Sequence, residues 1–403
     1  MDHIDRTIPL QRKWLTNVSN SGEPHQESFT VVNYNILADG YTPEQCFPYC
    51  PREYFKEFQR FPQLMRELDH HDADIVCLQE VGEEFHRTHL EPMLNNRGYQ
   101  GLYSISPSRA IGVAIFVKTS RFEVKKEELT DAFKIVEKEL ASYTDFDADA
   151  SLPAAHKEFI MPMVFCRLRC RKTGKFLNIG TFHLIFDWYK SIDLSTLQLS
   201  SAMRYIVEFA GGADQPHIMC GDMNQEPHFP GYQLMQNGCL TDEDKDFFRR
   251  RVEYQNSDKK KPCLVDQIPE LFSHESKHLK SAYKEVAGFE APFTCHEDYQ
   301  ALNVFPSARD AEKSPIPPTK QAKMDDSAQT EKLRPKSYRT EPENYGKEMF
   351  IATLDYFWYG SDRIQCDGVL EMIDESKIEQ FHSNPNIVFP SDHLLMKAEF
   401  HFL

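Results

Sequence analysis

Six short segments of this chain place polar or ionisable side chains where the pattern of a buried strand calls for hydrophobic ones. They are VVNYNIL (Asn33, Asn35), IVCLQEV (Gln79, Glu80), IGTFHLI (His183), IMCGDMN (Asp222, Asn224), TLDYFWYG (Asp355) and FPSDHLLM (Asp392, His393). Burying an unpaired charge is costly, so each group needs a partner. Taken alone, a strand-end aspartate more often caps a turn, and a histidine in a strand is more often a hydrogen-bonded core group. One shared site explains the whole set better.

The residue types indicate the chemistry of such a site. Carboxylate and amide oxygens are hard ligands that suit Mg²⁺ or Mn²⁺. Two histidines with neighbouring aspartates suit the stabilisation of a phosphoryl group and the handling of protons. The sequence therefore predicts a divalent-metal site for phosphate chemistry.

Composition sets outer bounds on this hypothesis. The 403 residues are 40% hydrophobic and include 29 Phe and 17 Tyr, enough for one large domain or two smaller ones. A net charge of −16 weighs against gripping nucleic acid through a broad basic face, although carboxylates that hold a cation still attract phosphate. The apolar runs are strand-sized, so none is expected to span a membrane. The ten cysteines lack C-x-x-C spacing and are expected to be reduced, mostly buried thiols.

Strand-like and helix-like segments alternate along the chain, which predicts the α/β class. The predicted strands cover residues 29–37, 73–81, 111–118, 163–170, 176–185, 217–222, 353–360 and 394–402, and the helical patterns cover 53–70, 194–210 and 242–251. Residues 1–28 are interpreted as an N-terminal extension. Residues 306–347 are rich in Pro, Lys, Ser and acids, which predicts a disordered insertion.

The ordered motifs NYNILADGY, CLQEV, TFHL, CGDMN, LDYFWYG and PSDHLLM resemble the endonuclease/exonuclease/phosphatase (DNase I-like) superfamily over residues 29–403. The similarity is greatest to its deadenylase-type branch. Within that branch, NILAD and the PYC that follows resemble the 2′,5′-phosphodiesterases in particular. This resemblance implies a two-sheet α/β sandwich with flanking helices, in four layers.

The resemblance also implies roles for individual residues. Glu80 matches the principal Mg²⁺ ligand, Asn35 its neighbour near the metal, and Asp392 an acid near a second metal. Asp222 matches the group that activates the attacking water, and Asn224 a hydrogen-bond donor to the transition state. His183 matches a histidine that contacts the phosphate. His393 matches a histidine that is oriented by Asp355.

Two positions depart from the family pattern and concern substrate preference. Thr181 stands where relatives have Asn, and Phe186-Asp187-Trp188 replaces a Trp-His/Asp-Pro motif. Trp188 is a candidate for stacking on a base, with a role in covering the core as the equal alternative. Phe350 matches an aromatic that stacks on adenine, with a core phenylalanine as the alternative.

The expected function is therefore Mg²⁺-dependent (or Mn²⁺-dependent) hydrolysis of adenylate-rich RNA ends, as 2′,5′-oligoadenylate or 3′–5′ poly(A), to 5′-AMP. One alternative is a phosphatase acting on an NADP-like nucleotide or another small phosphorylated molecule. Another is a non-catalytic interaction protein on the same fold. The N-terminus shows neither a secretory nor a transit pattern, so a cytoplasmic location is expected, with a mitochondrial one as the alternative suggested by the resemblance. The sequence leaves the oligomeric state open.

Overall fold

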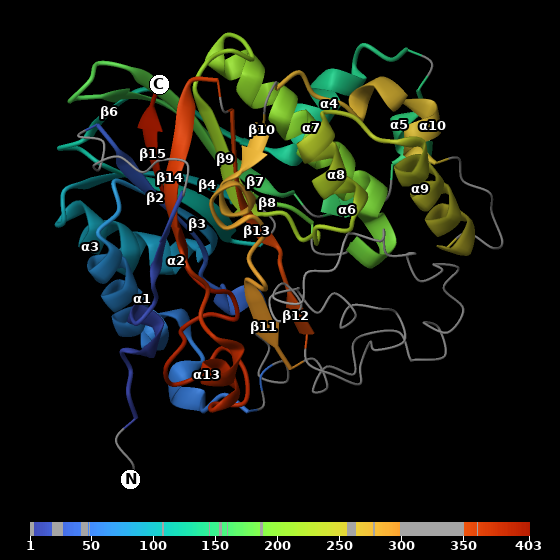
Figure 1. Ribbon diagram of the computed structural model, residues 1–403. Coiled ribbons are helices and arrows are strands. Elements are labelled where there is room, and N and C mark those ends of the chain that lie inside the picture. Colours follow the sequence, from blue (N-terminus) through green and yellow to red (C-terminus); the bar gives the residue numbers. More distant parts are fainter. Residues whose placement is uncertain are drawn as a thin grey trace, which may run out of the picture.

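The computed structural model shows two β-sheets packed face to face, with helices on their outer sides (Figure 1). It describes residues 4–17, 27–41, 47, 49–106, 109–144, 146–152, 155–158, 160–185, 188–255, 263–276, 279–298, 350–360 and 362–403. The predicted disordered insertion at 306–347 lies outside these residues, and the predicted division into domains stays a prediction.

The first sheet has seven strands in the order β1-β14-β15-β2-β3-β5-β4. Their bounds are Trp14–Thr16 (β1), Ile364–Leu370 (β14), Met396–Phe402 (β15), Phe29–Asn35 (β2), Ile75–Gly82 (β3), Ile111–Lys118 (β5) and Tyr99–Ser106 (β4). Only β2 and β3 pair in parallel. Strand β1 belongs to the predicted N-terminal extension and pairs with β14, so this part of the extension forms an edge of the sheet.

The second sheet has six strands in the order β10-β13-β9-β8-β7-β6, and a separate two-stranded sheet joins β11 to β12. The bounds are Leu279–Ser281 (β10), Asp355–Gly360 (β13), His217–Asp222 (β9), Phe176–His183 (β8), Pro162–Cys170 (β7), Phe122–Asp131 (β6), Cys295–Glu297 (β11) and Phe350–Ala352 (β12). Here β8 and β9 are the parallel pair, so each large sheet is mixed.

Three hydrophobic clusters separate the layers. One fills the space between the sheets, with Phe29, Ile75 and Val113 from the first sheet against Ile179 and Ile218 from the second. Alternate residues of the same strands face outward, where helices cover them. The resulting helix–sheet–sheet–helix arrangement confirms the predicted four-layer sandwich.

Helices α1 (Glu57–His71), α2 (Glu83–Phe85) and α3 (Glu91–Asn95), with a π-helical turn at His86–Leu90, cover the first sheet. The second sheet is covered by α4 (Ala132–Leu140), α7 (Trp188–Ala210), α8 (Pro230–Asn237), α9 (Asp242–Gln255) and α10 (Leu264–Gln267). Shorter helices are α5 (Ala148–Ser151), α6 (Ala155–Glu158), α11 (Ala282–Ala287) and α13 (Glu375–Glu379), and short 3₁₀ turns lie at Ile8–Leu10, Asp39–Tyr41, Arg52–Tyr54 and Pro269–Leu271.

All eight predicted strands and all three predicted helices are present, with ends shifted by a few residues. The patterns missed β4, β6 and β14, whose glycine or charged residues interrupt the expected alternation, and the three-residue strands β1, β10, β11 and β12. The spacing of Phe58, Leu64, Met65 and Leu68 predicts one apolar face for the helix at 53–70, but 57% of Phe58 is exposed, while the other three side chains are buried.

Every described cysteine is unbridged, and all of these except Cys239 are buried, as the spacing predicts. Among the described residues, no helix combines the length and apolarity that a bilayer crossing needs.

Candidate active site

Three neighbouring strands of the second sheet bring His183, Asp222 and Asp355 into one row. Asp222 ends β9 and lies opposite His183 in parallel β8 and opposite Asp355 in antiparallel β13. All three side chains continue the parity of residues that face the other sheet, such as Ile179, Ile218 and Phe357. Strand register therefore sets this half of the site.

Strand β9 reaches this row through Gly221, which follows its apolar residues and directly precedes Asp222. Gly221 has a φ of 155°, and a Cβ placed on it would lie 2.1 Å from the carbonyl oxygen of Phe182. Only glycine allows this close approach of β8 and β9 at the point where their polar residues begin.

The first sheet contributes Asn35 and Glu80. Asn35 ends β2 opposite Gln79, and both side chains share the inward parity of Val31 and Cys77. Glu80 has the opposite parity and would face the helices. However, β3 bulges against β5 between Leu78 and Val81, and Glu80 adopts a φ of 53°. The bulge redirects the carboxylate toward the second sheet.

Asn35 joins the two halves of the site. Its side-chain nitrogen donates to Glu80 Oε1 at 2.9 Å and to Asp222 Oδ2 at 3.0 Å. Its oxygen accepts the backbone N–H of Leu37 at 3.1 Å, and the N–H of Ala38 donates to the other Glu80 oxygen at 3.0 Å. Both carboxylates are thus held in place from within the fold.

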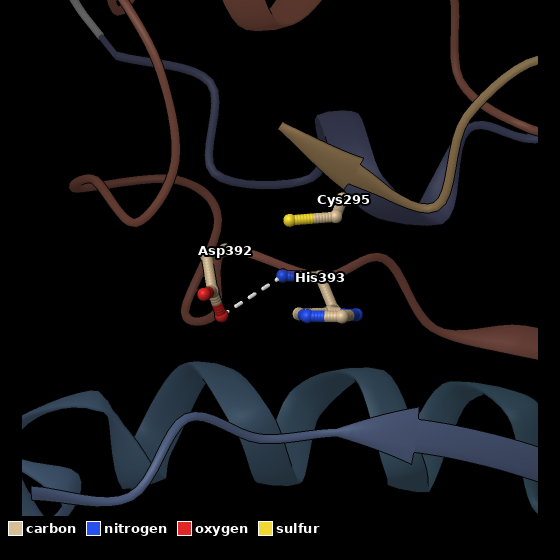
Figure 2. Close-up of side chains that lie close together, drawn as sticks. All are labelled: Cys295, Asp392 and His393. Atoms are coloured by element: carbon tan, nitrogen blue, oxygen red, sulfur yellow. Dashed lines mark hydrogen bonds between the residues drawn. The ribbon is translucent and has the colours of Figure 1, made fainter. Parts of the chain in front are cut away.

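The final segment delivers Asp392 and His393, drawn in Figure 2. His393 Nδ1 pairs with Asp355 Oδ2 at 2.7 Å, and its Nε2 lies 3.7 Å from Asp222 Oδ2. The hydroxyl of Ser391 donates to the Asn35 carbonyl at 2.7 Å and to Asp392 Oδ1 at 3.0 Å. The last loop is therefore fastened to the end of β2.

The carboxylates of Glu80 and Asp222 are buried and lie close to other acidic side chains. Burial raises the pKa of Glu80 to about 8, with the charge of Asp392 adding to the effect. Burial also raises the pKa of Asp222 to about 7, with Asp355 adding to it. Carboxylates in this position favour a bound cation, because the cation relieves both the burial cost and the mutual repulsion.

The two histidines differ in charge. Burial, helped by the charge of His393, lowers the pKa of His183 to about 3, so that ring is neutral. Burial alone would lower the pKa of His393 as well, but the surrounding negative charge, from Asp355 above all, outweighs burial and raises it well above the usual value. His393 is accordingly a cation whose Nε2 lies 3.7 Å from Asp222 Oδ2, and His183 is a neutral hydrogen-bonding group 3.6 Å from the same oxygen.

The donor set fits a hard divalent cation. Ligand atoms of Glu80, His183 and Asp222 lie within 4.8 Å of one another, and all three residues are buried. Two carboxylates among these three groups match the oxygen preference of Mg²⁺ and Mn²⁺. The structure therefore supports a divalent-cation site formed by these three residues.

The remaining predicted residues take different positions. Asn224 donates its backbone N–H to Asp222 Oδ1 at 2.8 Å and its side-chain N–H to the Leu184 carbonyl at 2.9 Å. Trp188 begins α7, and its side chain lies outside what the structure describes. Phe350 begins β12, is half-buried, and packs against a small cluster that contains Cys295. Thr181 accepts a hydrogen bond from Gln79 at 2.9 Å beneath the site.

Sequence reasoning missed Ser391 and Cys295. Ser391 lies inside the quoted PSDH motif, and its hydroxyl before two polar residues was an available signal. Cys295 sits in a three-residue strand too short to show a pattern, yet it lies opposite His393 in an isolated β-bridge.

A family model described as the Endonuclease/Exonuclease/phosphatase family matches residues 33–393. The chain belongs to that family. The predicted enzyme class, a hydrolase of ester bonds, agrees with this membership.

Curated relatives of this family member include carbon catabolite repressor protein 4 homolog 1 of Arabidopsis thaliana, which is 25% identical over 410 residues, covering 95% of this chain and 59% of the relative. Another is the CCR4-Not complex 3′-5′-exoribonuclease subunit Ccr4 of Neosartorya fischeri, 24% identical over 444 residues, covering 97% of this chain and 50% of the relative. The chain thus spans between half and three fifths of the length of these relatives. These similarities are consistent with the predicted deadenylase-type branch.

Solved structures confirm the fold of this Endonuclease/Exonuclease/phosphatase member. ANGEL2, described as a 2′,3′-cyclic phosphatase, superposes with a TM-score of 0.67 at 20% identity, covering 97% of this chain and 99% of that one. The human Nocturnin catalytic domain gives a TM-score of 0.56 at 18% identity, with both chains fully covered.

Proposed function

We propose that this protein is a metal-dependent phosphodiesterase that releases 5′-AMP from adenylate-rich RNA ends, joined either 2′–5′ or 3′–5′. The observation that supports this most is the meeting of Glu80, Asp222 and His393 between the two sheets. Relatives that match nearly all of this chain carry the name 3′-5′-exoribonuclease, which favours an RNA end as substrate.

Asp222 has the position and environment of a proton acceptor for the attacking water. Its two oxygens are fixed by Asn35 and by the backbone of Asn224, and its raised pKa brings its basicity close to neutral pH. His393, kept cationic by Asp355, donates to a phosphoryl oxygen, while neutral His183 offers a further hydrogen bond on the same side.

Glu80 is the residue we propose as the principal metal ligand, with Asp392 near it. A divalent cation held there supplies positive charge to the non-bridging phosphoryl oxygens. The amide nitrogen of Asn35 donates hydrogen bonds to Glu80 and Asp222. The predicted roles of the Asn35 oxygen and of Asp392 as metal ligands stay predictions. Mg²⁺ is the ion we propose, with Mn²⁺ as a second possibility.

The proposal is tested with purified protein, Mg²⁺ and linear 2′,5′- and 3′,5′-oligoadenylates, by comparing initial rates of 5′-AMP release. A chelator should abolish the release. Glu80→Gln should lower it by about 10²-fold or more, because the cation loses its charged ligand. The matched control is Glu84→Gln, on the exposed side of α2, which should keep the full rate. Undiminished AMP release by Glu80→Gln would overturn the proposal.

The same assay separates the alternatives. NADP⁺ as substrate would give free phosphate if the protein were a nucleotide phosphatase, whereas oligoadenylate gives 5′-AMP. No product from either substrate, together with no thermal response to Mg²⁺, would point to a non-catalytic interaction protein.

The substrate contacts and the compartment are also proposals. Phe350 and Trp188 are proposed to stack on adenine, which predicts that Phe350→Ala raises KM for oligoadenylate more than it lowers kcat. We propose a cytoplasmic location, with mitochondria as the alternative, to be decided by fractionation of cells that express the untagged protein.

A further inference from the structure

A thiol lies against the two polar residues of the last loop. Cys295 of β11 forms an antiparallel bridge with His393, so the two side chains leave the backbone on the same side. The Leu394 N–H donates to the Thr294 carbonyl at 2.8 Å, and the His296 N–H donates to the Asp392 carbonyl at 3.0 Å. Backbone hydrogen bonds on both sides of Cys295 therefore fix its position opposite His393.

These residues form a ligand set of their own. Atoms able to bind a metal on Cys295, Asp392 and His393 all lie within 4.8 Å of one another, and the three residues are buried. Figure 2 shows the sulfur and the carboxylate on neighbouring sides of the imidazole. Tetrahedral metal bonds of about 2.0–2.3 Å place the donor atoms roughly 3.5 Å apart, a separation that lies within the 4.8 Å limit found for this set.

The chemistry of this set differs from that of the Glu80 site. Glu80, Asp222 and their neighbours offer mainly oxygen, which favours Mg²⁺ or Mn²⁺. One sulfur, one nitrogen and one oxygen favour a softer ion, since thiolate and imidazole are the ligands of zinc. Three protein ligands leave one coordination position open for water.

We propose that Cys295, Asp392 and His393 form a second cation site that takes a thiophilic divalent ion of the Zn²⁺ class. Binding forms a metal–sulfur bond and releases to water the thiol proton and, because the His393 ring is cationic, the proton of the ring nitrogen that binds, with no change of oxidation state. The ion also binds a ring nitrogen of His393. In the structure, Nδ1 of this ring pairs with Asp355 and Nε2 lies 3.7 Å from Asp222 Oδ2. An occupied site therefore inhibits any reaction that needs His393 as a cation.

Cd²⁺ is a direct probe of the binding, which does not depend on the proposed function. Titration of the reduced full chain, with Mg²⁺ present, should produce thiolate-to-Cd²⁺ charge-transfer absorption that saturates at one ion per chain. Cys295→Ser should remove this absorption, and Cys239→Ser, which changes an exposed thiol elsewhere, should keep it. Absorption that survives Cys295→Ser, or none in the unmodified chain, would overturn the proposal.

X-ray absorption of the Zn²⁺-loaded unmodified chain gives a second measurement that needs no variant. One sulfur at about 2.3 Å beside nitrogen and oxygen ligands is expected. A shell of nitrogen and oxygen alone would overturn the proposal.

The inhibitory effect rests on the proposed function and is measured separately. At saturating Mg²⁺, the ratio of AMP-release rates without and with Zn²⁺ should fall by about ten-fold or more in Cys295→Ser relative to the unmodified chain. An unchanged ratio would remove the inhibitory role. Absence of AMP release in all samples would instead count against the proposed function. The Cd²⁺ titration would then still test the cation site by itself.

Discussion

The side-chain amide of Asn35, in one sheet, donates a 3.0 Å hydrogen bond to Asp222, in the other, and a 2.9 Å bond to Glu80. This single residue connects the principal proposed metal ligand with the proposed base. The site is therefore assembled across the sandwich, and its geometry depends on how the two sheets pack.

Asn35→Ala should weaken both stability and metal binding. The change leaves Glu80 and Asp222 buried without their shared donor, at a cost of about 1–3 kcal/mol in the free energy of unfolding. Mg²⁺ affinity should fall by about ten-fold, because the carboxylates lose their fixed orientation. Denaturant unfolding with and without Mg²⁺ measures both effects.

Asn33→Ala is the matched control. Asn33 has the same strand and parity but accepts its hydrogen bond from Gln79, at 2.8 Å. It should cost stability and leave Mg²⁺ affinity unchanged. Equal Mg²⁺ affinities in Asn35→Ala and the unmodified chain would contradict the connecting role of Asn35.

Asp355→Asn should lower kcat by about 10²–10⁴-fold with a smaller effect on KM, because His393 loses the partner that keeps it cationic and oriented. Steady-state kinetics on oligoadenylate provides the measurement. Asp367→Asn is the matched control, because Asp367 also pairs with a histidine, His401, whose Nδ1 lies 2.8 Å away. This pair joins β14 to β15 and is not part of the site. Loss of kcat in both variants alike would indicate a general structural effect.

Gly221→Ala should be among the most damaging single-methyl changes in the chain. Its Cβ would meet the Phe182 carbonyl oxygen at 2.1 Å, so β8 and β9 must separate and Asp222 must move. We expect a loss above about 3 kcal/mol in the free energy of unfolding. Gly211→Ala, at a φ of 87° with nothing within 4 Å of the new Cβ, isolates backbone strain and should cost about 1–2 kcal/mol. Similar losses in the two variants would contradict the steric explanation.

Glu67 should give stability a pH dependence of its own, away from the site. Burial raises the pKa of Glu67 to about 8 from its ordinary 4.5, although the charge of Arg12 and a hydrogen bond from Tyr34 both act to lower it. The folded state therefore prefers the protonated form. Its contribution to stability is complete below pH 4.5 and is lost as the pH rises through about 8.

Glu67→Gln keeps the shape without the charge, so it should flatten this dependence and stabilise the protein near pH 8 by a few kcal/mol, on the order of 1.4 per unit of pKa shift. Urea unfolding between about pH 4 and pH 9, a range that includes both pKa values of Glu67, measures this dependence. The exposed Glu84→Gln should leave the slope as it is. A steeper slope in Glu67→Gln would refute the assignment.

Much of the site follows from strand parity, which is visible in the sequence. Asn35, His183, Asp222 and Asp355 each continue the inward alternation of their strands, so the period of two already predicts that each faces the core of the sandwich. The family resemblance then assigned them roles. The pattern could not predict the order in which the strands pair within each sheet, because strands of similar composition can pair in several orders.

Glu80 and Cys295 show where local reasoning ends. Glu80 has the wrong parity, and only the bulge in β3, formed against β5, redirects its carboxylate toward Asn35 and His183. Cys295 lies beside the site only because its strand forms a β-bridge with His393, almost a hundred positions later in the chain. The positions of both side chains depend on contacts between distant segments, and the residues next to them in the sequence do not predict such contacts.

By itself, then, the sequence determined the fold class, the inward-facing rows of polar side chains and the kind of ion they favour, because these depend on residue type and on spacing within single strands. The tertiary structure alone decided that two sheets share one amide at Asn35, that Glu80 turns inward and that a thiol faces His393, because such relationships are set by packing between strands far apart in the chain.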